Sequence, residues 1–479
     1  MTTHNDPRYF ISKNPATGAI VWEGLAADSL VVDRAINQSR KAFLDWRALS
    51  IESRKAYLEK FCEILTDQKA SIAETISAEM GKPLWEALLE VGAMLNKLPI
   101  TLAAYHERCP EKKEVLKEGV SMTRHKPLGV LAVFGPFNFP GHLPNGHILP
   151  ALLAGNTIIF KASELTPRVA EKVMACWEAS GISEGVIQLL QGGKETGQLI
   201  AEHMGIDGVL FTGSFKTGAA LATLFSTRPG KLLALEMGGN NPLVVHEVED
   251  LEAAVYCIIQ SAYLTTGQRC TCARRLIVVN NAMGQALISA LIQAISKIKV
   301  GAYTESPEPF MGPLVSEFAA SQVVNAYESL LKLGGVALVP LLKLRSDNAT
   351  FLSPSLVDVT PIESRLDQEI FGPLLQLIWV DSFEEALKEA NNTRYGLAAG
   401  LLCDSEALHR QFFSTVNAGI IHWNRPLTGA SSQAPFGGIQ CSGNYRPSAY
   451  YAADYCAYPV ASLEETQLKK PEKRTPGLE

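Results

Sequence analysis

The chain has 479 residues, of which 47% are hydrophobic and 19% are charged, and its formal net charge is −6. This length allows two or three domains with large cores, and the acidic balance disfavours a nucleic-acid-binding surface. Nine cysteines at scattered positions exclude a disulfide framework and indicate a reducing compartment. The polar N-terminus and the lack of a long apolar run predict a cytoplasmic protein without a membrane span.

Apolar residues at helical spacing predict helices over about 28–46 and from about 51 into the 70s. The run 79–83, which contains Gly81 and Pro83, interrupts this pattern before a third predicted helix.

From Gly129 onward, short apolar runs alternate with helical patterns. These runs predict strands over 129–134, 156–160, 186–190, 208–211 and 231–235. Such alternation is typical of α/β proteins with a parallel, doubly wound sheet. Ligands bind beyond the carboxyl ends of such strands, so the residues that follow each strand are candidates for chemistry.

A second α/β stretch runs from about 251 to 430, with predicted helices over 281–298, 316–333 and 382–391. The boundary between the two stretches falls at 236–242, next to Glu236. The segment 115–127 alternates and leads out of the first stretch, and the polar segment 464–479 is a predicted tail.

Cys270 and Glu236 are the most informative pair of residues. Cys270 lies in the stretch GQRCTC, and Glu236 lies 34 residues earlier (270 − 236) in LEMGG, so we expect both beside the cleft between domains. A thiolate is a nucleophile, and a carboxylate can deprotonate either the thiol or an attacking water. Taken singly, most buried cysteines are inert packing residues and most such Glu-Met-Gly-Gly runs are turns, so the pair depends on its surroundings.

A strand-to-helix turn and a charged loop are candidates for binding a cofactor. The turn contains Gly213, Ser214, Phe215, Lys216, Thr217 and Gly218, whose two glycines and helix N-terminus suit a phosphate. Lys161 and Glu164 follow another strand and suit a ribose, and the carboxylate favours NAD over NADP. The alternatives are a plain turn and a solvated charged loop.

Two further loops carry candidate residues. Asn138 lies in PFNFP, where two prolines fix a side-chain amide that suits an oxyanion. Glu369 and Phe371, in EIFGP, are candidates for contacts with a cofactor's ribose and ring. A turn asparagine and a loop anchor are the alternatives. His142 and His147 lack a third ligand at metal-binding spacing, so we expect no metal site.

Together these motifs resemble the NAD(P)-dependent aldehyde dehydrogenase superfamily over residues 14–459, with all motifs in order. The resemblance is carried by FGPFNFPG, LALEMGGNNPL, GQRCTC and WNRPLTGASSQAPFGG. It implies an α/β fold with a Rossmann-like NAD-binding domain over 1–113 and 128–236. A catalytic domain would cover 237–430, and an oligomerisation arm and tail would cover 114–127 and 445–479.

The resemblance also implies roles for the residues that match. Cys270 would attack the aldehyde, Asn138 would hold the oxyanion, and Glu236 would activate the hydrolytic water. Lys161, Glu164 and the turn 213–218 would bind NAD, and Glu369 and Phe371 would position its nicotinamide half.

The resemblance is closest to members that oxidise an acidic semialdehyde with two carboxylates. Such a substrate calls for cations, and the candidates in order are Arg425, Arg446 and Arg269. The alternatives are another acidic semialdehyde, such as glutamate or succinate semialdehyde, and a non-catalytic NAD-binding protein. The family implies a homodimer or homotetramer with interfaces at 115–126 and 450–463, and we expect no nucleic-acid or membrane partner.

Overall fold

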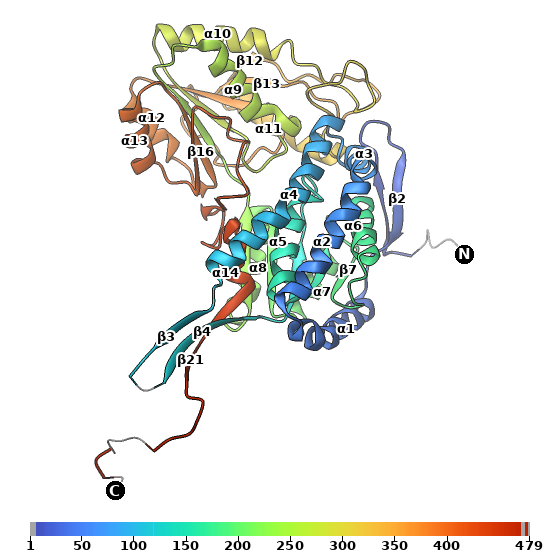
Figure 1. The fold of residues 1–479 in the computed structure, drawn as a ribbon. Coiled ribbons are helices and arrows are strands. Elements are labelled where there is room, and N and C mark those ends of the chain that lie inside the picture. The colour runs from blue at the N-terminus through green and yellow to red at the C-terminus, as the bar shows by residue number, and fades with distance from the viewer. Residues whose placement is uncertain (1–5, 118, 471–474, 478–479) are drawn as a thin grey trace.

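Two parallel sheets with flanking helices make up most of the molecule, and a small antiparallel sheet projects from it (Figure 1). The computed structural model describes residues 6–117, 119–470 and 475–477; parts of the predicted domain 1–113, arm 114–127 and tail 445–479 lie outside the described residues. The predicted α/β class is confirmed. The residue ranges assigned to domains remain a prediction.

The first sheet has five parallel strands in the order β7-β6-β5-β8-β9. Their bounds are β5 Val130–Phe134, β6 Thr157–Lys161, β7 Ile187–Leu189, β8 Gly208–Gly213 and β9 Leu232–Met237. Successive residues of β5 point to opposite faces, so Leu131 and Val133 join one core while Val130 and Ala132 join another. Both faces of this sheet are therefore covered, as parallel sheets require.

Helices from before and between the strands provide this cover. One face packs on α5 and α6, with α2, α3 and α4 outside them, and the other packs on α1 and α7. The bounds are α1 Ser29–Ala48, α2 Ile51–Asp67, α3 Lys69–Met80, α4 Leu84–Arg108, α5 His142–Ala154, α6 Pro167–Ala179, α7 Lys194–Glu202 and α8 Phe215–Phe225.

The second sheet has seven strands in the order β12-β13-β14-β11-β10-β16-β17, and only β12 runs antiparallel to its neighbour. The strands are β10 Pro242–Val245, β11 Arg275–Val279, β12 Val336–Val339, β13 Ser355–Asp358, β14 Leu374–Val380, β16 Ala398–Leu402 and β17 Ile420–Trp423. The helices are α9 Leu251–Tyr263, α10 Ala282–Ile295, α11 Glu317–Lys332, α12 Phe383–Ala390 and α13 Glu406–Thr415. α9 and α10 pack on one core, and α11, α12 and α13 on another.

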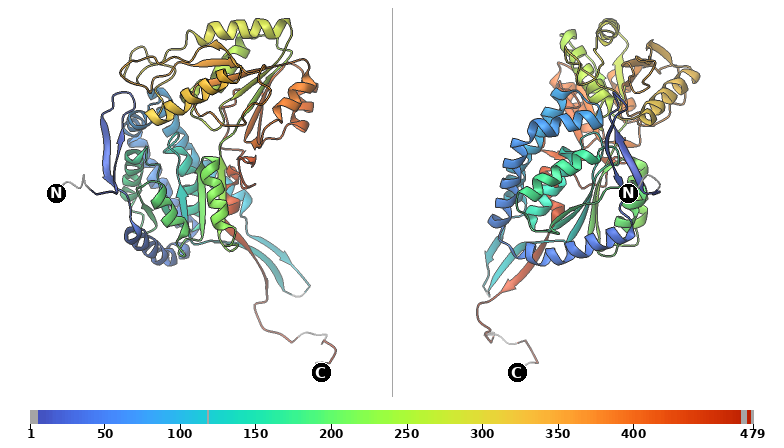
Figure 2. Two further views of the ribbon diagram at one scale, coloured as in Figure 1. Left: turned by 180° about the vertical axis from the view of Figure 1, so that it is seen from behind. Right: turned by 90° about the vertical axis from the view of Figure 1, so that its right-hand side faces the viewer.

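The projecting sheet joins distant parts of the chain. β21 (Ala457–Glu464) pairs with β4 (Val120–Pro127), which pairs with β3 (Lys112–Val115). The three strands extend away from the first sheet in all views (Figures 1 and 2). Short pieces complete the fold: β1 Tyr9–Lys13 with β2 Ile20–Leu25, β15 Tyr395–Gly396 with β19 Ile439–Gln440, β18 Pro435–Phe436 with β20 Ser448–Ala449, and α14 Ala453–Cys456.

One described helix, α4, is long and apolar enough by length and composition to cross a membrane, a test that the core helices of globular proteins also pass. The helix nevertheless packs along α3 and α5. It also carries Glu86, Glu90 and Lys97 as buried residues, and buried charges of this kind need partners inside the protein. The helix therefore supplies charged groups to the interior of the first domain.

Candidate active site

A cavity of about 260 Å³ opens between α4, α5 and the loops that follow α9 and β17. Cys270, Arg269 and Thr271 form one part of its wall, and Glu236 and Thr212 form another. The carboxyl end of the first sheet and loops connected to the second sheet thus meet here. A larger, more open depression near α6 and β7 has no cysteine or histidine in its lining.

The loop before Cys270 has an unusual backbone. Thr265, Thr266 and Gly267 all have positive φ angles, of 55°, 58° and 70°. A Cβ at Gly267 would lie 2.1 Å from the carbonyl oxygen of Gly372, so only glycine fits. Glu86 anchors the loop by accepting bonds from the backbone N–H of Thr265 at 3.1 Å and its hydroxyl at 2.7 Å. Strain held in this way is common at functional sites.

Cys270 itself is fixed through its backbone. The side-chain amide of Asn241, next to β10, donates to the carbonyl oxygens of Cys270 and Cys272 at 2.7 and 2.8 Å. Burial raises the pKa of the Cys270 thiol to about 12, and the nearby carboxylates of Glu369 and Glu236 add to this effect. The thiol is therefore neutral near pH 7 until a base removes its proton.

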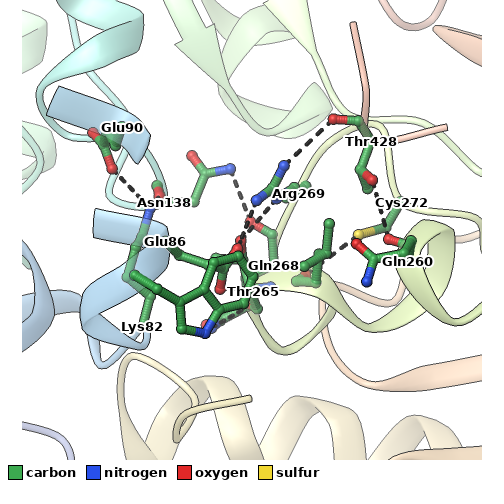
Figure 3. Close-up of polar contacts among 12 residues, drawn as sticks. Lys82, Glu86, Glu90, Asn138, Gln260, Thr265, Gln268, Arg269, Cys272 and Thr428 are labelled. Carbon is green, nitrogen blue, oxygen red and sulfur yellow. Dashed lines mark hydrogen bonds and ion pairs between the residues drawn. The ribbon is translucent and has the colours of Figure 1, made fainter. Parts of the chain in front are cut away.

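Asn138 is buried beside the same loop. The side-chain amide of Asn138 donates to the backbone carbonyl oxygen of Gln268 at 2.8 Å. The backbone carbonyl oxygen of Asn138 accepts a bond from the Lys82 ammonium at 2.7 Å. Lys82 is held by Glu90 at 2.7 Å, and both side chains are fully buried (Figure 3). The amide has two N–H groups, of which one bonds Gln268, and Asn138 lies behind the cavity lining rather than in it.

Glu236 lies in β9 rather than in the loop that the sequence suggested, because residues up to Met237 pair with β8. One carboxylate oxygen accepts a bond from the backbone N–H of Ser448 at 3.2 Å. The other is buried and has no hydrogen-bond partner among the described residues. Burial raises the pKa of Glu236 well above its ordinary value, which makes it a stronger base than a solvated carboxylate.

Glu369 and Phe371 lie close to the same loop. A Cβ at Gly238 would lie 1.7 Å from Oε2 of Glu369, so the glycine leaves room for this carboxylate. Burial raises the pKa of Glu369 to about 7, while Arg274, whose guanidinium lies 3.7 Å away, opposes the rise. The Phe371 ring packs edge-on against Phe137, with 5.8 Å between ring centroids.

The predicted cofactor turn has the expected geometry. β8 ends at Gly213, and the Ser214 hydroxyl caps α8 by accepting from the backbone N–H of Thr217 at 3.4 Å. Gly218 is buried, and a Cβ there would lie 2.3 Å from Sδ of Met237. The glycine thus allows α8 to pack on β9, and the exposed first turn presents backbone N–H groups that suit an anion.

Phe215 and Lys216 lie in the first turn of α8. The Phe215 ring contacts Tyr395 edge-on at 6.3 Å between centroids, whereas Lys216 is exposed. At the end of β6, the Lys161 ammonium lies 3.6 Å from the exposed Glu164 carboxylate. Burial lowers the pKa of Lys161. Lys161, Glu164 and the turn all lie at the carboxyl edge of the first sheet.

The three candidate arginines have different positions. Arg269 lines the cavity, where it donates to Glu86 at 2.6 Å (Figure 3). Its guanidinium also lies over the Phe139 ring. Arg425 and Arg446 are exposed and are not part of the cavity lining. Arg425 is exposed because Asn424, with φ 50°, bonds the backbone of Cys403 through both ends of its side-chain amide, which leaves Arg425 outside.

Sequence reasoning missed the charged residues of α4 that face the cavity. Glu86, Glu90 and Lys97 all line it. Their spacing of four and seven residues puts them on one face of a helix, and charges at such spacing in an apolar helix were the available signal. Two cations are among the residues that line the cavity. Arg269 was predicted from the sequence, and Lys97 was not.

The two histidines of the cavity are neutral. Burial lowers the pKa of both His142 and His147 to about 3, and the charge of Lys97 adds to this. His147 contacts the hydroxyl of Tyr455 at 3.0 Å. Within the described part of the chain, no group of three metal-ligating side chains is present.

The fold and this arrangement define an aldehyde dehydrogenase, and a model described as the aldehyde dehydrogenase family matches residues 2–459. The chain belongs to this family. An N-succinylglutamate 5-semialdehyde dehydrogenase of Ectopseudomonas mendocina (strain ymp) is 53% identical to it over 467 residues, or 98% of this chain and 96% of the relative. The enzyme of the same description from Paraburkholderia xenovorans (strain LB400) is 52% identical over 470 residues, with the same coverage of both chains.

A solved structure is similar as well. An indole-3-acetaldehyde dehydrogenase from P. syringae, in complex with NAD+ and IAA, has a TM-score of 0.89 and 26% sequence identity. The match covers 95% of this chain and 93% of that one.

Proposed function

We propose that the protein oxidises N-succinyl-L-glutamate 5-semialdehyde to N-succinyl-L-glutamate, with NAD as hydride acceptor, in the succinyltransferase pathway of arginine catabolism. The identity of 53% and 52% to two enzymes of that description supports the substrate. The observation that carries the proposed chemistry is that Cys270 and Glu236 line one cavity, with Asn138 bonded to the loop of Cys270.

The first half of the reaction needs a nucleophile and an oxyanion site. The Cys270 thiol loses its proton to a base such as Glu236, and the thiolate attacks the aldehyde carbon to give a thiohemiacetal. The free amide N–H of Asn138 and the backbone N–H of Cys270 stabilise the developing oxyanion. NAD held in this site would accept the hydride that the thiohemiacetal oxyanion expels, and an enzyme thioester would remain.

The second half needs a base for water. Glu236, whose pKa is raised by burial, first releases the thiol proton to solvent. It then accepts a proton as water attacks the thioester carbonyl and passes this proton to the leaving thiolate, which frees the acid and restores the thiol. The unpaired oxygen of Glu236 is suited to this role, because no described residue competes for it.

The residues at the carboxyl edge of the first sheet fit NAD. The first turn of α8 suits the pyrophosphate, and Lys161 and Glu164 suit the adenosine ribose. From the second sheet, a buried oxygen of Glu369 that accepts no hydrogen bond from a described residue suits a ribose hydroxyl. The NAD+ in the similar P. syringae structure supports this assignment. The first sheet would then belong to the cofactor domain and the second to the catalytic domain.

Assembly and location are further parts of the proposal. β21 forms the edge of the projecting sheet, and its free side suits pairing with a second copy in a homodimer or homotetramer. The nine cysteines are free, which supports a cytoplasmic location. Of the three candidate arginines, Arg269 has the strongest support as a substrate contact, because it lines the cavity.

The test is NADH formation with N-succinylglutamate semialdehyde beside glutamate and succinate semialdehydes, with Cys270→Ala as the blank. A kcat/KM at least about tenfold higher for the succinylated substrate is expected, because its extra polar groups find partners in the site. Equal or better activity on either shorter aldehyde would contradict the substrate. Unchanged activity in the blank would contradict the mechanism.

A further inference from the structure

The cavity beside Cys270 contains a buried cation whose charge the described residues leave unbalanced. Lys97, on α4, lines the cavity and is only 3% exposed. Its ammonium donates to the hydroxyl of Ser432 at 3.2 Å, and no described carboxylate lies within ion-pair distance of it. Ser432 belongs to the loop after β17, which closes the same side of the cavity.

The other cation of the cavity lining and the two carboxylates of α4 are already paired. Arg269 is paired with Glu86 at 2.6 Å, and Glu90 is paired with Lys82 at 2.7 Å. His142 and His147 are neutral, because burial lowers their pKa values to about 3. Lys97 is therefore the cation that remains available when the other pairs are made.

A buried ammonium with one neutral hydroxyl as its partner is unfavourable. Removing it from water costs several kcal/mol, and a hydroxyl replaces little of the lost hydration. Burial accordingly lowers the pKa of Lys97 to about 8. An anionic ligand would supply the missing charge and bond the remaining N–H groups of the ammonium.

We propose that Lys97, together with the hydroxyl of Ser432, binds a carboxylate of the substrate and selects acidic aldehydes over neutral ones. The inference rests on the proposed function, because the proposed substrate has two carboxylates that need cationic partners. A neutral aldehyde leaves the ammonium as unpaired as it is in the free enzyme, so only the acid gains binding energy from Lys97. Lys97 is then a substrate-binding residue, and Arg269 is left as the candidate for the other carboxylate.

The decisive variants are Lys97→Met, which keeps the length of the side chain without its charge, and Lys97→Arg, which keeps the charge. For Lys97→Met, we expect KM for N-succinylglutamate semialdehyde to rise roughly 10- to 100-fold, as for loss of a charged hydrogen bond. KM for a neutral aldehyde such as butanal should stay within about twofold, and kcat for both should change little. Lys97→Arg should recover part of the loss.

Folding gives a second readout. Because Lys97 has no carboxylate partner, Lys97→Met should leave Tm unchanged or raise it, whereas a structural lysine would lower it on substitution. An equal rise of KM for both aldehydes, or an unchanged KM for the acidic one, would overturn the proposal. A lower Tm with equal loss on both substrates would do the same.

Inhibition separates this inference from the proposed function. With butanal as substrate, N-succinylglutamate should inhibit competitively, and its inhibition constant should rise roughly 10- to 100-fold in Lys97→Met. If the wild-type enzyme does not prefer the succinylated aldehyde but this shift is seen, the proposed substrate fails and the carboxylate site stands. If the wild-type enzyme prefers the succinylated aldehyde but Lys97→Met changes neither KM for it nor the inhibition constant of N-succinylglutamate, only the proposed carboxylate site is wrong.

Discussion

The guanidinium of Arg269 donates to the carboxylate of Glu86 at 2.6 Å, so the residue before the reactive cysteine is tied to helix α4. Glu86 also bonds the backbone and hydroxyl of Thr265 at the start of the same loop. One carboxylate, with a side chain 1% exposed, thus positions both ends of the segment 265–269. The stability of this segment depends on a residue about 180 positions away in the chain.

Replacing Glu86 by alanine should therefore destabilise the protein. The loss of one partner of a buried pair costs about 3–5 kcal/mol, because it leaves the other charge unpaired. Denaturant unfolding measures the change. The matched control is Glu406→Ala, which removes an exposed i,i+4 partner of Arg410 and should cost at most about 1 kcal/mol. Equal effects of the two substitutions would contradict the anchoring role of Glu86.

Replacing Asn138 by alanine should slow catalysis without a large change in substrate binding. The amide would act on charge that develops in the transition state, and loss of one such donor costs about 10²–10³ in kcat. Steady-state kinetics with the preferred aldehyde gives the value. Asn138→Asp is the control, because it keeps the size but replaces the donor by an acceptor. A normal kcat in both variants would remove Asn138 from the mechanism.

Replacing Glu236 by glutamine should separate the two halves of the reaction. Thioester hydrolysis should fall by roughly 10²–10⁴, as expected for loss of a general base. If another base can deprotonate Cys270, a rapid burst of one NADH per site will precede slow turnover in stopped-flow measurements. A normal steady-state rate would contradict the assignment of Glu236 as the base.

The wild-type pH profile tests the same residue. Burial raises the pKa of Glu236, and the active form of a base is the deprotonated one. Hydrolysis should therefore increase as the pH rises through a value well above that of an ordinary glutamate, and it should be lost as the pH falls. The rise of the hydrolysis rate with pH should be absent from the pH profile of Glu236→Gln.

Binding of N-succinylglutamate should have the opposite pH dependence. Burial lowers the pKa of Lys97 to about 8, and only its protonated form attracts a carboxylate. The inhibition constant of N-succinylglutamate should thus rise as the pH increases through about 8, and Lys97→Met should abolish this dependence. The charged and titratable groups that line the cavity with it are Glu86, Glu90, His142, His147, Glu236, Arg269 and Cys270. A dependence that survives in Lys97→Met would belong to one of those groups.

A methyl group at Gly267 should disturb the loop of Cys270. Its Cβ would lie 2.1 Å from the carbonyl oxygen of Gly372, so the loop or its neighbour must shift. A displacement of about 1 Å near the nucleophile can cost 10²-fold in rate. Gly334→Ala is the control, because it also has a positive φ, of 104°, but its Cβ would have nothing within 4 Å. Similar activity in the two variants would show that the close approach is unimportant.

Local sequence patterns predicted most helices and strands well. They predicted the surroundings of the site residues less completely. Strongly periodic helices such as α1, α10 and α11 and the apolar strands β5 and β6 lie within a few residues of the predicted bounds. Helix α5 was not predicted, because Pro144 and Pro150 lie inside it and nearly all its residues are buried, which removes the amphipathic signal. Glu236 was expected in a loop because the two glycines after it hid the end of the strand.

The candidate site depended on contacts that no local pattern contains. Cys270, Glu236 and Asn138 are recognisable from their motifs. The partnership of Glu86 with Arg269 and the exposure of Arg425 are set by how α4 and the loop after β17 pack. Long-range pairing of charges is a property of the folded chain, so Lys97 could be identified only after its neighbours were seen to be paired.

The hydrogen bond from Ser448 to Glu236 joins residues 212 positions apart, and β21 follows Ser448 in the chain. During synthesis, both large sheets can fold while this segment is still inside the ribosome. The carboxylate then lacks its backbone donor, and β4 lacks the strand that pairs with it. The active site and the projecting sheet therefore both wait for the segment from Ser448 to the end of β21, so unfinished chains have Cys270 without the finished surroundings of Glu236.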